Sequence, residues 1–216
     1  MTEQEWAECT DPQPMLAFLK GKVSDRKLRL FAIACCRRMW YLLPEWGRRA
    51  VGVAERFAEG TADEEELTAA RRTLPPTPPR YFGSPLSRQY KIWEAVAEIL
   101  TPSLMPARVA GFVVEALLRE EEPATQCFWL REIIGNPFRP VALDPSWRTP
   151  TVTALAAAAY EDRVLPVGTL DNDRLAVLAD ALEDAGCNDE QLLAHLREPS
   201  PHVRGCWVID LLLGKE

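Results

Sequence analysis

Residues 178–216 read LADALEDAGCNDEQLLAHLREPSPHVRGCWVIDLLLGKE, and the spacing of apolar residues, prolines and glycines in this stretch decides the fold class. Apolar residues recur every three or four positions, which is the spacing of an amphipathic helix. Gly186 follows the first apolar run, where helices commonly end in a left-handed turn. Asn188 is then predicted to be an N-cap, with Gln191 as its reciprocal partner. The stretch therefore predicts three short helices joined by two tight turns.

The third of these helices is predicted to begin after Ser200, which would act as its N-cap, with Pro201 at the first helical position. Residues 203–213 are apolar nearly all round, a pattern typical of a helix that is buried on several sides. We therefore expect this helix to lie within the core, and we expect its removal to unfold the domain.

The rest of the chain shows the same helical spacing interrupted by proline and glycine. Thr2 with Glu5 predicts a capping box, and Ser24 predicts an N-cap. No segment alternates strictly between apolar and polar residues, so no sheet is predicted. The segments SDRKLRLFAIACCRRMW and SPHVRGCWVIDLLL share a serine cap and an apolar run with cysteine, which favours stacked helix pairs. We predict an all-α fold of about nine or ten short helices in stacked antiparallel pairs, HEAT-like or an irregular helical bundle.

A proline-rich segment, LPPTPPRYFGSP at residues 74–85, interrupts the helical pattern. Five of its twelve residues are proline, which precludes a helix or a central strand. We interpret it as a rigid connector, and a proline-rich peptide ligand is the alternative. The sequence therefore predicts an N-terminal helical subdomain at residues 1–73 and a C-terminal helical subdomain at residues 86–216. One continuous domain is the alternative to this division.

The composition predicts a soluble protein of the cytoplasm. Apolar residues make up 47% of the chain, enough for a core, and no apolar run reaches the length of a transmembrane helix. The N-terminal segment MTEQEWAECTDP is acidic and polar, unlike a signal peptide. We therefore expect a cytoplasmic protein with no membrane partner, in which the six cysteines are reduced.

The charge distribution raises the question of an anionic partner. A net charge of −7 argues against a dedicated nucleic-acid binder, yet residues 20–49 carry nine basic and two acidic residues. This segment could bind nucleic acid or another anionic partner, or it could attract the acidic remainder of the chain. The candidate partner-binding residues are four arginines of the segment and two tryptophans near prolines: Arg26, Arg29, Arg37, Arg38, Trp46 and Trp147.

The two histidines lie near two cysteines in residues 178–216 and form the strongest candidate site. His202 and Cys206 are four residues apart, so they would share one face of the predicted third helix. If the three helices fold back on each other, four side chains could bind zinc tetrahedrally, namely Cys187, His195, His202 and Cys206. No Cys-x-x-Cys pair supports such a site. The alternative is a buried helix in which His202 bonds to a carbonyl or to Asp210.

A Cys–His nucleophile pair is a second candidate site. Its cysteine would be Cys206 or Cys35, and its base would be His202 or His195. A reactive thiol needs electropositive, partly exposed surroundings, whereas both cysteines lie in apolar segments. The chain also has no glycine-rich phosphate loop and no dinucleotide fingerprint. We therefore predict that the protein is not an enzyme and needs no cofactor, with zinc as the alternative.

Several blocks of sequence resemble a large paralogous family of planctomycete bacterial proteins. The blocks are, in this order, WAECTDPQPML, SDRKLRLFAIACCRRMW, GNPFRPV, LADALEDAGC and HVRGCWVIDLLLGKE. Members of that family often carry a cysteine where this chain has Leu196, so this chain lacks one thiol near His195. The resemblance implies a bacterial, cytoplasmic protein, and it implies no activity and no catalytic residues.

These observations together favour a non-catalytic protein-interaction or adaptor module, because stacked helices expose broad grooves. The expected partner is another protein. The alternatives are a zinc-stabilised helical domain and a binder of an anionic partner, such as nucleic acid, through residues 20–49.

Overall fold

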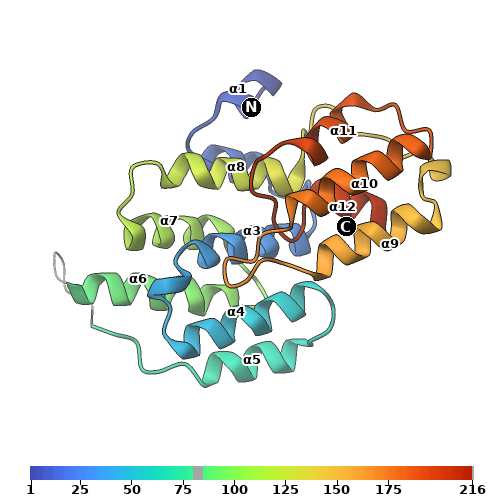
Figure 1. Cartoon of the computed structure of the whole chain (residues 1–216). Coiled ribbons are helices and arrows are strands. Elements are labelled where there is room, and N and C mark those ends of the chain that lie inside the picture. The colour runs from blue at the N-terminus through green and yellow to red at the C-terminus, as the bar shows by residue number, and fades with distance from the viewer. Residues whose placement is uncertain (80–84, 216) are drawn as a thin grey trace. The chain divides into compact units, whose positions relative to one another are not determined.

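The computed structural model of the protein describes residues 1–79 and 85–215. These residues form twelve α-helices and two short 3-10 helices, and they contain no β-strand (Figure 1). The all-α prediction is confirmed, with more helices than the predicted nine or ten. No helix in the described part of the chain combines the length and apolar character needed to cross a membrane. Residues 80–84 of the predicted connector lie outside the described residues.

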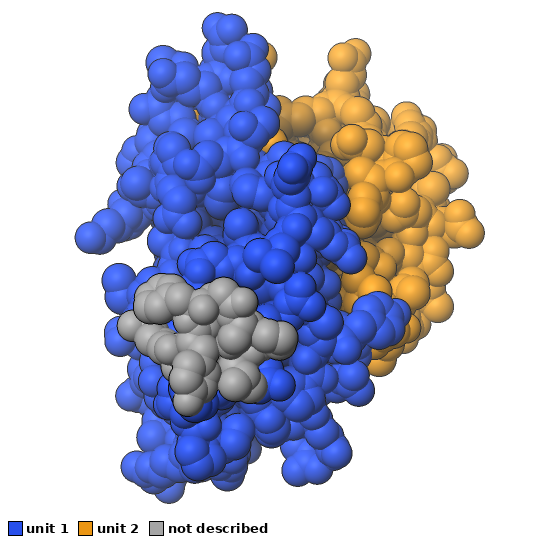
Figure 2. Space-filling model, turned by 90° about the vertical axis from the view of Figure 1, so that its left-hand side faces the viewer, with its two compact units in different colours: residues 1–130 blue, residues 131–216 orange. Residues whose placement is uncertain are grey.

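The chain divides into two compact units, Met1–Leu130 (unit 1) and Arg131–Glu216 (unit 2), which Figure 2 shows in different colours. This boundary differs from the one predicted at residues 74–85. The helix after that segment, α6 (Pro85–Ile99), packs against α3, α4 and α7 (Asp25–Arg38, Glu45–Ala58 and Pro106–Leu117) within unit 1. Prolines interrupt regular backbone, but they do not prevent the helices on either side from sharing a core.

Unit 1 is organised around α3, in which every residue from 29 to 37 is buried. Ser24 caps this helix by accepting a hydrogen bond from the amide of Lys27, as predicted. Thr2 and Glu5 form the predicted capping box of α1. The other elements of unit 1 are α1 (Glu3–Glu8), α2 (Pro12–Leu19), η1 (Trp40–Leu42), α5 (Glu64–Arg72) and most of α8 (Glu122–Ile134).

Unit 2 contains the end of α8, η2 (Pro145–Trp147), α9 (Pro150–Glu161), α10 (Asn172–Asp184), α11 (Glu190–Arg197) and α12 (Trp207–Leu213). Its helices α10 and α12 both pack against α9, and α11 packs against α10 (Figure 1). Their leucines, alanines and valines form one buried cluster. Asp189, and not the predicted Asn188, caps α11 by accepting from the amide of Leu192.

The last helix begins later than the sequence predicted. It starts at Trp207, whereas Ser200 and Pro201 lie in an irregular segment. Contacts with residues 169–172 help to hold that segment in place: the amide of Leu170 donates to the carbonyl of His202 at 2.8 Å, Val203 pairs with Thr169 in an isolated antiparallel bridge, and the side-chain amide of Asn172 donates to the carbonyl of Ser200. Gly205 then takes a φ of +92°, which is incompatible with a helix. The chain can therefore enter α12 only after this turn.

Candidate metal centre

Four side chains of unit 2 converge on one point. Each offers one ligand atom, and no two of these atoms are more than 4.8 Å apart. The four residues are Glu132, His195, His202 and Cys206. The structure thus brings together three of the four predicted ligands and adds a glutamate in place of Cys187.

Each of the four comes from a different place in unit 2. Glu132 lies in the last turn of α8 and His195 in the last turn of α11. His202 lies in the irregular segment after α11, and Cys206 is the residue immediately before α12. The expectation that His202 and Cys206 share one helix face is therefore wrong. They meet because the turn at Gly205 folds the segment back.

Three contacts in the cluster have lengths near the edges of a tetrahedral metal site, with Glu132 offering a different oxygen to each histidine. His195 Nε2 lies 3.2 Å from Glu132 Oε2 and 3.2 Å from the Sγ of Cys206. His202 Nδ1 lies 3.1 Å from Glu132 Oε1. With zinc bonds of about 2.0–2.3 Å, the edges of a tetrahedral site measure about 3.3–3.6 Å. Small side-chain shifts would therefore admit an ion among these atoms.

The second nitrogen of His202 has a partner of its own. Its Nε2 lies 3.3 Å from the carbonyl oxygen of Glu198, which can only accept a hydrogen. That contact places a proton on Nε2. In the metal-free cluster Nδ1 donates to the carboxylate of Glu132, and removal of the Nδ1 proton would turn its lone pair toward the cluster. Metal-binding histidines in proteins are commonly oriented in this way. The alternative prediction named a carbonyl or Asp210 as the partner of His202, and the structure shows a carbonyl on one nitrogen and Glu132 on the other.

The cluster contains a buried negative charge. Burial works to raise the pKa of Glu132, but hydrogen bonds from His195 and His202 hold that pKa below its ordinary value. Burial works to lower the pKa of His202, but its bond to Glu132 raises it above the usual value. Burial, followed by the charge of Glu132, raises the pKa of Cys206 well above its usual range. Burial disfavours each of these charges. A divalent cation would compensate them, because its two positive charges balance one carboxylate and one thiolate, with two neutral imidazoles completing the site.

The same geometry argues against a Cys–His nucleophile. In a catalytic relay the acid bonds to the histidine nitrogen that does not face the nucleophile. Here one nitrogen, Nε2 of His195, faces both Cys206 and Glu132. The Cys206 thiol is also fully buried. Cys35 is fully buried too, and burial raises its pKa well above the usual range. Neither thiol has the exposed, electropositive setting that reactivity requires.

The predicted cluster contained Cys187, whereas the observed cluster contains Glu132 in its place. Cys187 is buried in the apolar core of unit 2 and is not one of the four converging residues. Glu132 was missed because it stands 63 residues before His195, with no metal-ligand spacing nearby. One signal did exist: Glu132 falls on the face of α8 that also carries the buried residues Trp129 and Ile133. A carboxylate on a buried helix face requires a partner.

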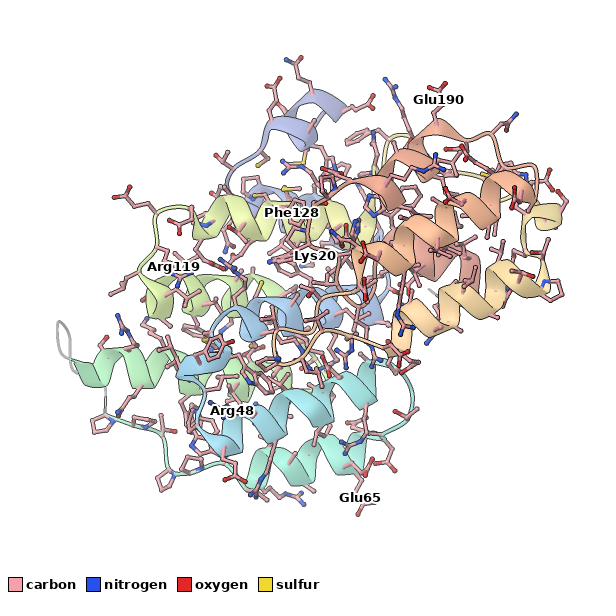
Figure 3. The ribbon with its side chains drawn as sticks, viewed as in Figure 1. Lys20, Arg48, Glu65, Arg119, Phe128 and Glu190 are labelled. Carbon is pink, nitrogen blue, oxygen red and sulfur yellow. The ribbon has the colours of Figure 1, made fainter. Side chains whose placement is uncertain are left out.

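The arginines predicted to bind an anionic partner are engaged within unit 1. Arg37 binds the carboxylate of Glu55, Arg38 that of Glu122, and Arg26 that of Glu59. Arg29 donates to the carbonyls of Ile99, the last residue of α6, and of Thr101 and Pro102, which follow it. Arg48 of the same basic segment, labelled in Figure 3, stacks on Trp40. Four arginines of residues 20–49 therefore join α3 to α4, to α8 and to the end of α6.

The two predicted partner-binding tryptophans are half-buried. Trp46 lies on α4, and Trp147 packs against the apolar core of unit 2. Both rings therefore contribute part of their area to the packing of their own unit.

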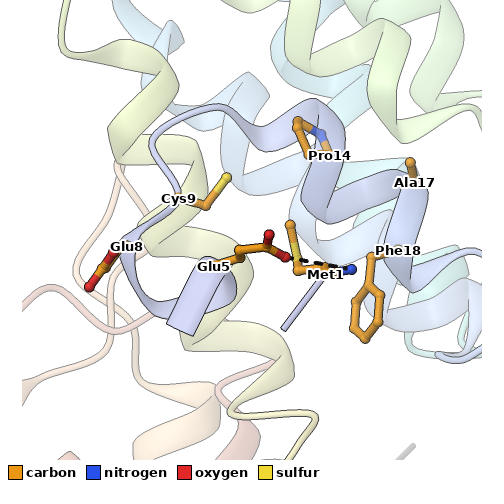
Figure 4. Close-up of a pocket in the computed structure, with 7 residues that line it drawn as sticks. All are labelled: Met1, Glu5, Glu8, Cys9, Pro14, Ala17 and Phe18. Atoms are coloured by element: carbon orange, nitrogen blue, oxygen red, sulfur yellow. Dashed lines mark ion pairs between the residues drawn. The ribbon is translucent and has the colours of Figure 1, made fainter. Parts of the chain in front are cut away.

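A pocket opens beside α1 and α2 in unit 1 (Figure 4). It is lined by Met1, Glu5, Glu8, Cys9, Pro14, Ala17 and Phe18. Its polar groups already have partners: the Met1 amino group pairs with Glu5, Glu8 accepts from the side chain of Gln4, and the Cys9 thiol donates to the carbonyl of Asp11. We assign no ligand to this pocket.

Comparison with known proteins adds no assignment, because no family model, no curated protein and no solved structure matches this chain. The resemblance to planctomycete bacterial proteins therefore stays a prediction.

Proposed function

We propose that residues 131–216 form a helical domain that binds a zinc ion through Glu132, His195, His202 and Cys206 and is stabilised by it. The observation that supports this most strongly is the convergence of four donor atoms within 4.8 Å of one another. Two imidazoles, a carboxylate and a thiolate are the ligand types that zinc takes in proteins, and four protein ligands characterise structural sites. The role is therefore structural and not catalytic.

A metal ion at this position would join segments that are far apart in the chain. Glu132 stands at the end of α8, and Cys206 stands at the start of α12. Between them, His202 belongs to a segment without regular structure, whose backbone is held mainly by bonds to residues 169–172. Such a segment gains the most from a cross-link, because the free energy of metal binding adds to that of folding.

Metal content tests the proposal. The full chain, purified without chelator and supplied with zinc, is expected to contain one zinc ion per molecule by elemental analysis. Cys206→Ser and His202→Ala should each reduce the content about tenfold or more, since each removes one of four ligands. Cys187→Ser is the matched control, because it removes a buried thiol of the same unit outside the cluster, and it should keep the ion. Absence of stoichiometric zinc from the wild-type protein would reject the metal centre.

An exposed apolar turn favours a second function, binding of another protein. Val164, Leu165 and Val167 lie in the connection between α9 and α10, and their exposed fractions are 53%, 66% and 39%. Neighbouring exposed apolar side chains of this kind commonly mark contact surfaces. We propose that this turn contacts a partner protein, in keeping with an adaptor role. A HEAT-like stack of antiparallel helix pairs is part of the same proposal.

The triple variant V164S/L165S/V167S tests this second function. It should weaken partner binding about tenfold or more, because apolar contact area is lost at the centre of the interface. Quantitative mass spectrometry of affinity-purified complexes measures the change. Val177→Ser serves as control, since Val177 is also exposed in unit 2 but lies on α10. Equal recovery of the same partners by the triple variant would contradict the role of the turn.

A further inference from the structure

One of the four proposed zinc ligands is accessible from solvent. The side chain of His195 is 14% exposed, whereas that of Glu132 is 1% exposed and that of His202 is fully buried. Cys206 is also fully buried. An ion therefore has to enter and leave the cluster past the imidazole of His195. A group that restricts the rotation of the His195 imidazole therefore slows the passage of the ion.

Two rings lie against the imidazole of His195: that of His202, at 4.8 Å between centroids, and the indole of Trp207, which is not itself a member of the cluster. The centroids of the indole and the His195 imidazole are 5.2 Å apart, with the planes tilted by 51°. The indole also lies against Gly135: a Cβ added at Gly135 would stand only 3.1 Å from the ring. Gly135, the residue after α8, also has a φ of +75°. Glycine is favoured at this position both by the positive φ and by the close approach of the indole. Trp207 thus packs against both Gly135 and His195.

We infer that Trp207 positions His195 and sets the rate at which the metal ion enters and leaves the site. This inference rests on the zinc centre proposed above. His195 must rotate about its side-chain torsions to open the route, and the adjacent indole blocks part of that rotation. Removing the indole lowers the barrier in both directions, so the exchange rate changes more than the affinity does.

Metal release from the full-length zinc-loaded protein tests the inference. A stopped-flow experiment with excess pyridylazoresorcinol gives the release rate of wild type and of Trp207→Ala. The variant should release zinc about tenfold faster or more, with a smaller change in dissociation constant. Trp207→Phe retains a ring beside His195 and should stay within about threefold of wild type. If Trp207→Ala does not fold, Trp207→Leu replaces it, since leucine keeps apolar contact with the core but has no ring.

Trp147→Ala is the matched control, because Trp147 is a second half-buried tryptophan packed on the same core. It should release zinc at the wild-type rate. Equal rates for wild type and Trp207→Ala would overturn the inference, and so would equal acceleration in Trp147→Ala, which would indicate general loosening. A wild-type protein that holds no zinc would instead reject the metal centre itself, so the two failures are distinguishable.

Discussion

Removal of zinc by a chelator is expected to lower the unfolding temperature of residues 131–216 by about 15–30 °C. Zinc present at about 1,000 times its dissociation constant contributes about 4 kcal/mol to the stability of the state that binds it. In a domain of fewer than about 100 residues, each kcal/mol shifts the midpoint by about 4–8 °C. Scanning calorimetry of the full chain with and without chelator measures the shift, and the transition of unit 1 serves as the internal reference.

When zinc is removed, the segment around His202 should be the first part of unit 2 to lose its structure. The amide of Leu170 donates to the carbonyl of His202, so its hydrogen exchange reports on this segment directly. Chelation should remove the protection of that amide well before the core of α10 exchanges. His202→Ala should reproduce both effects without chelator, and Cys187→Ser should reproduce neither. An unchanged thermogram in protein shown to have lost its zinc would mean that the ion has no structural role.

The all-α class and the caps of several helices follow from local sequence. Ser24 and the Thr2–Glu5 box cap their helices as predicted, because a capping side chain bonds to amides within three residues of itself. The start of α11 is displaced by one residue, since Asp189 and Asn188 are equally good caps and both stand in the turn. Helix caps can be predicted from sequence because both bonding groups lie within a few residues of each other.

The errors concern interactions between distant residues. Ser200 and Pro201 have the pattern of a helix start, yet bonds to residues 169 and 170 hold this segment in an irregular conformation. Gly205 was the local sign that the helix starts later. Glu132 enters the cluster from a helix that ends 61 residues before His195, so ligand spacing could not identify it. Three members of the cluster come from one segment and could be predicted, and the fourth, Glu132, required the fold.

The arginines of α3 show that a cluster of positive charge in the sequence can have its partners within the same chain. The segment 20–49 is rich in arginine, but the carboxylates that match it lie on other helices of unit 1. The buried pair Arg37–Glu55 is the closest of these contacts, with two hydrogen bonds of 2.6 and 2.8 Å. A paired guanidinium in this position stabilises the unit, whereas an unpaired one would be available to an anionic ligand.

Replacing Arg37 by alanine should therefore destabilise unit 1 by about 3–5 kcal/mol, because the buried carboxylate of Glu55 loses two charge-assisted hydrogen bonds from the guanidinium. The double variant R37M/E55L should recover most of this loss, since neither charge then remains buried. Arg49→Ala is the control: its pair with Glu45 is exposed, and its loss should cost less than about 1 kcal/mol. Urea unfolding followed by circular dichroism gives all three values. If Arg37→Ala were as stable as wild type but bound polyanions more weakly, the arginines of α3 would have to be assigned to an anionic partner after all.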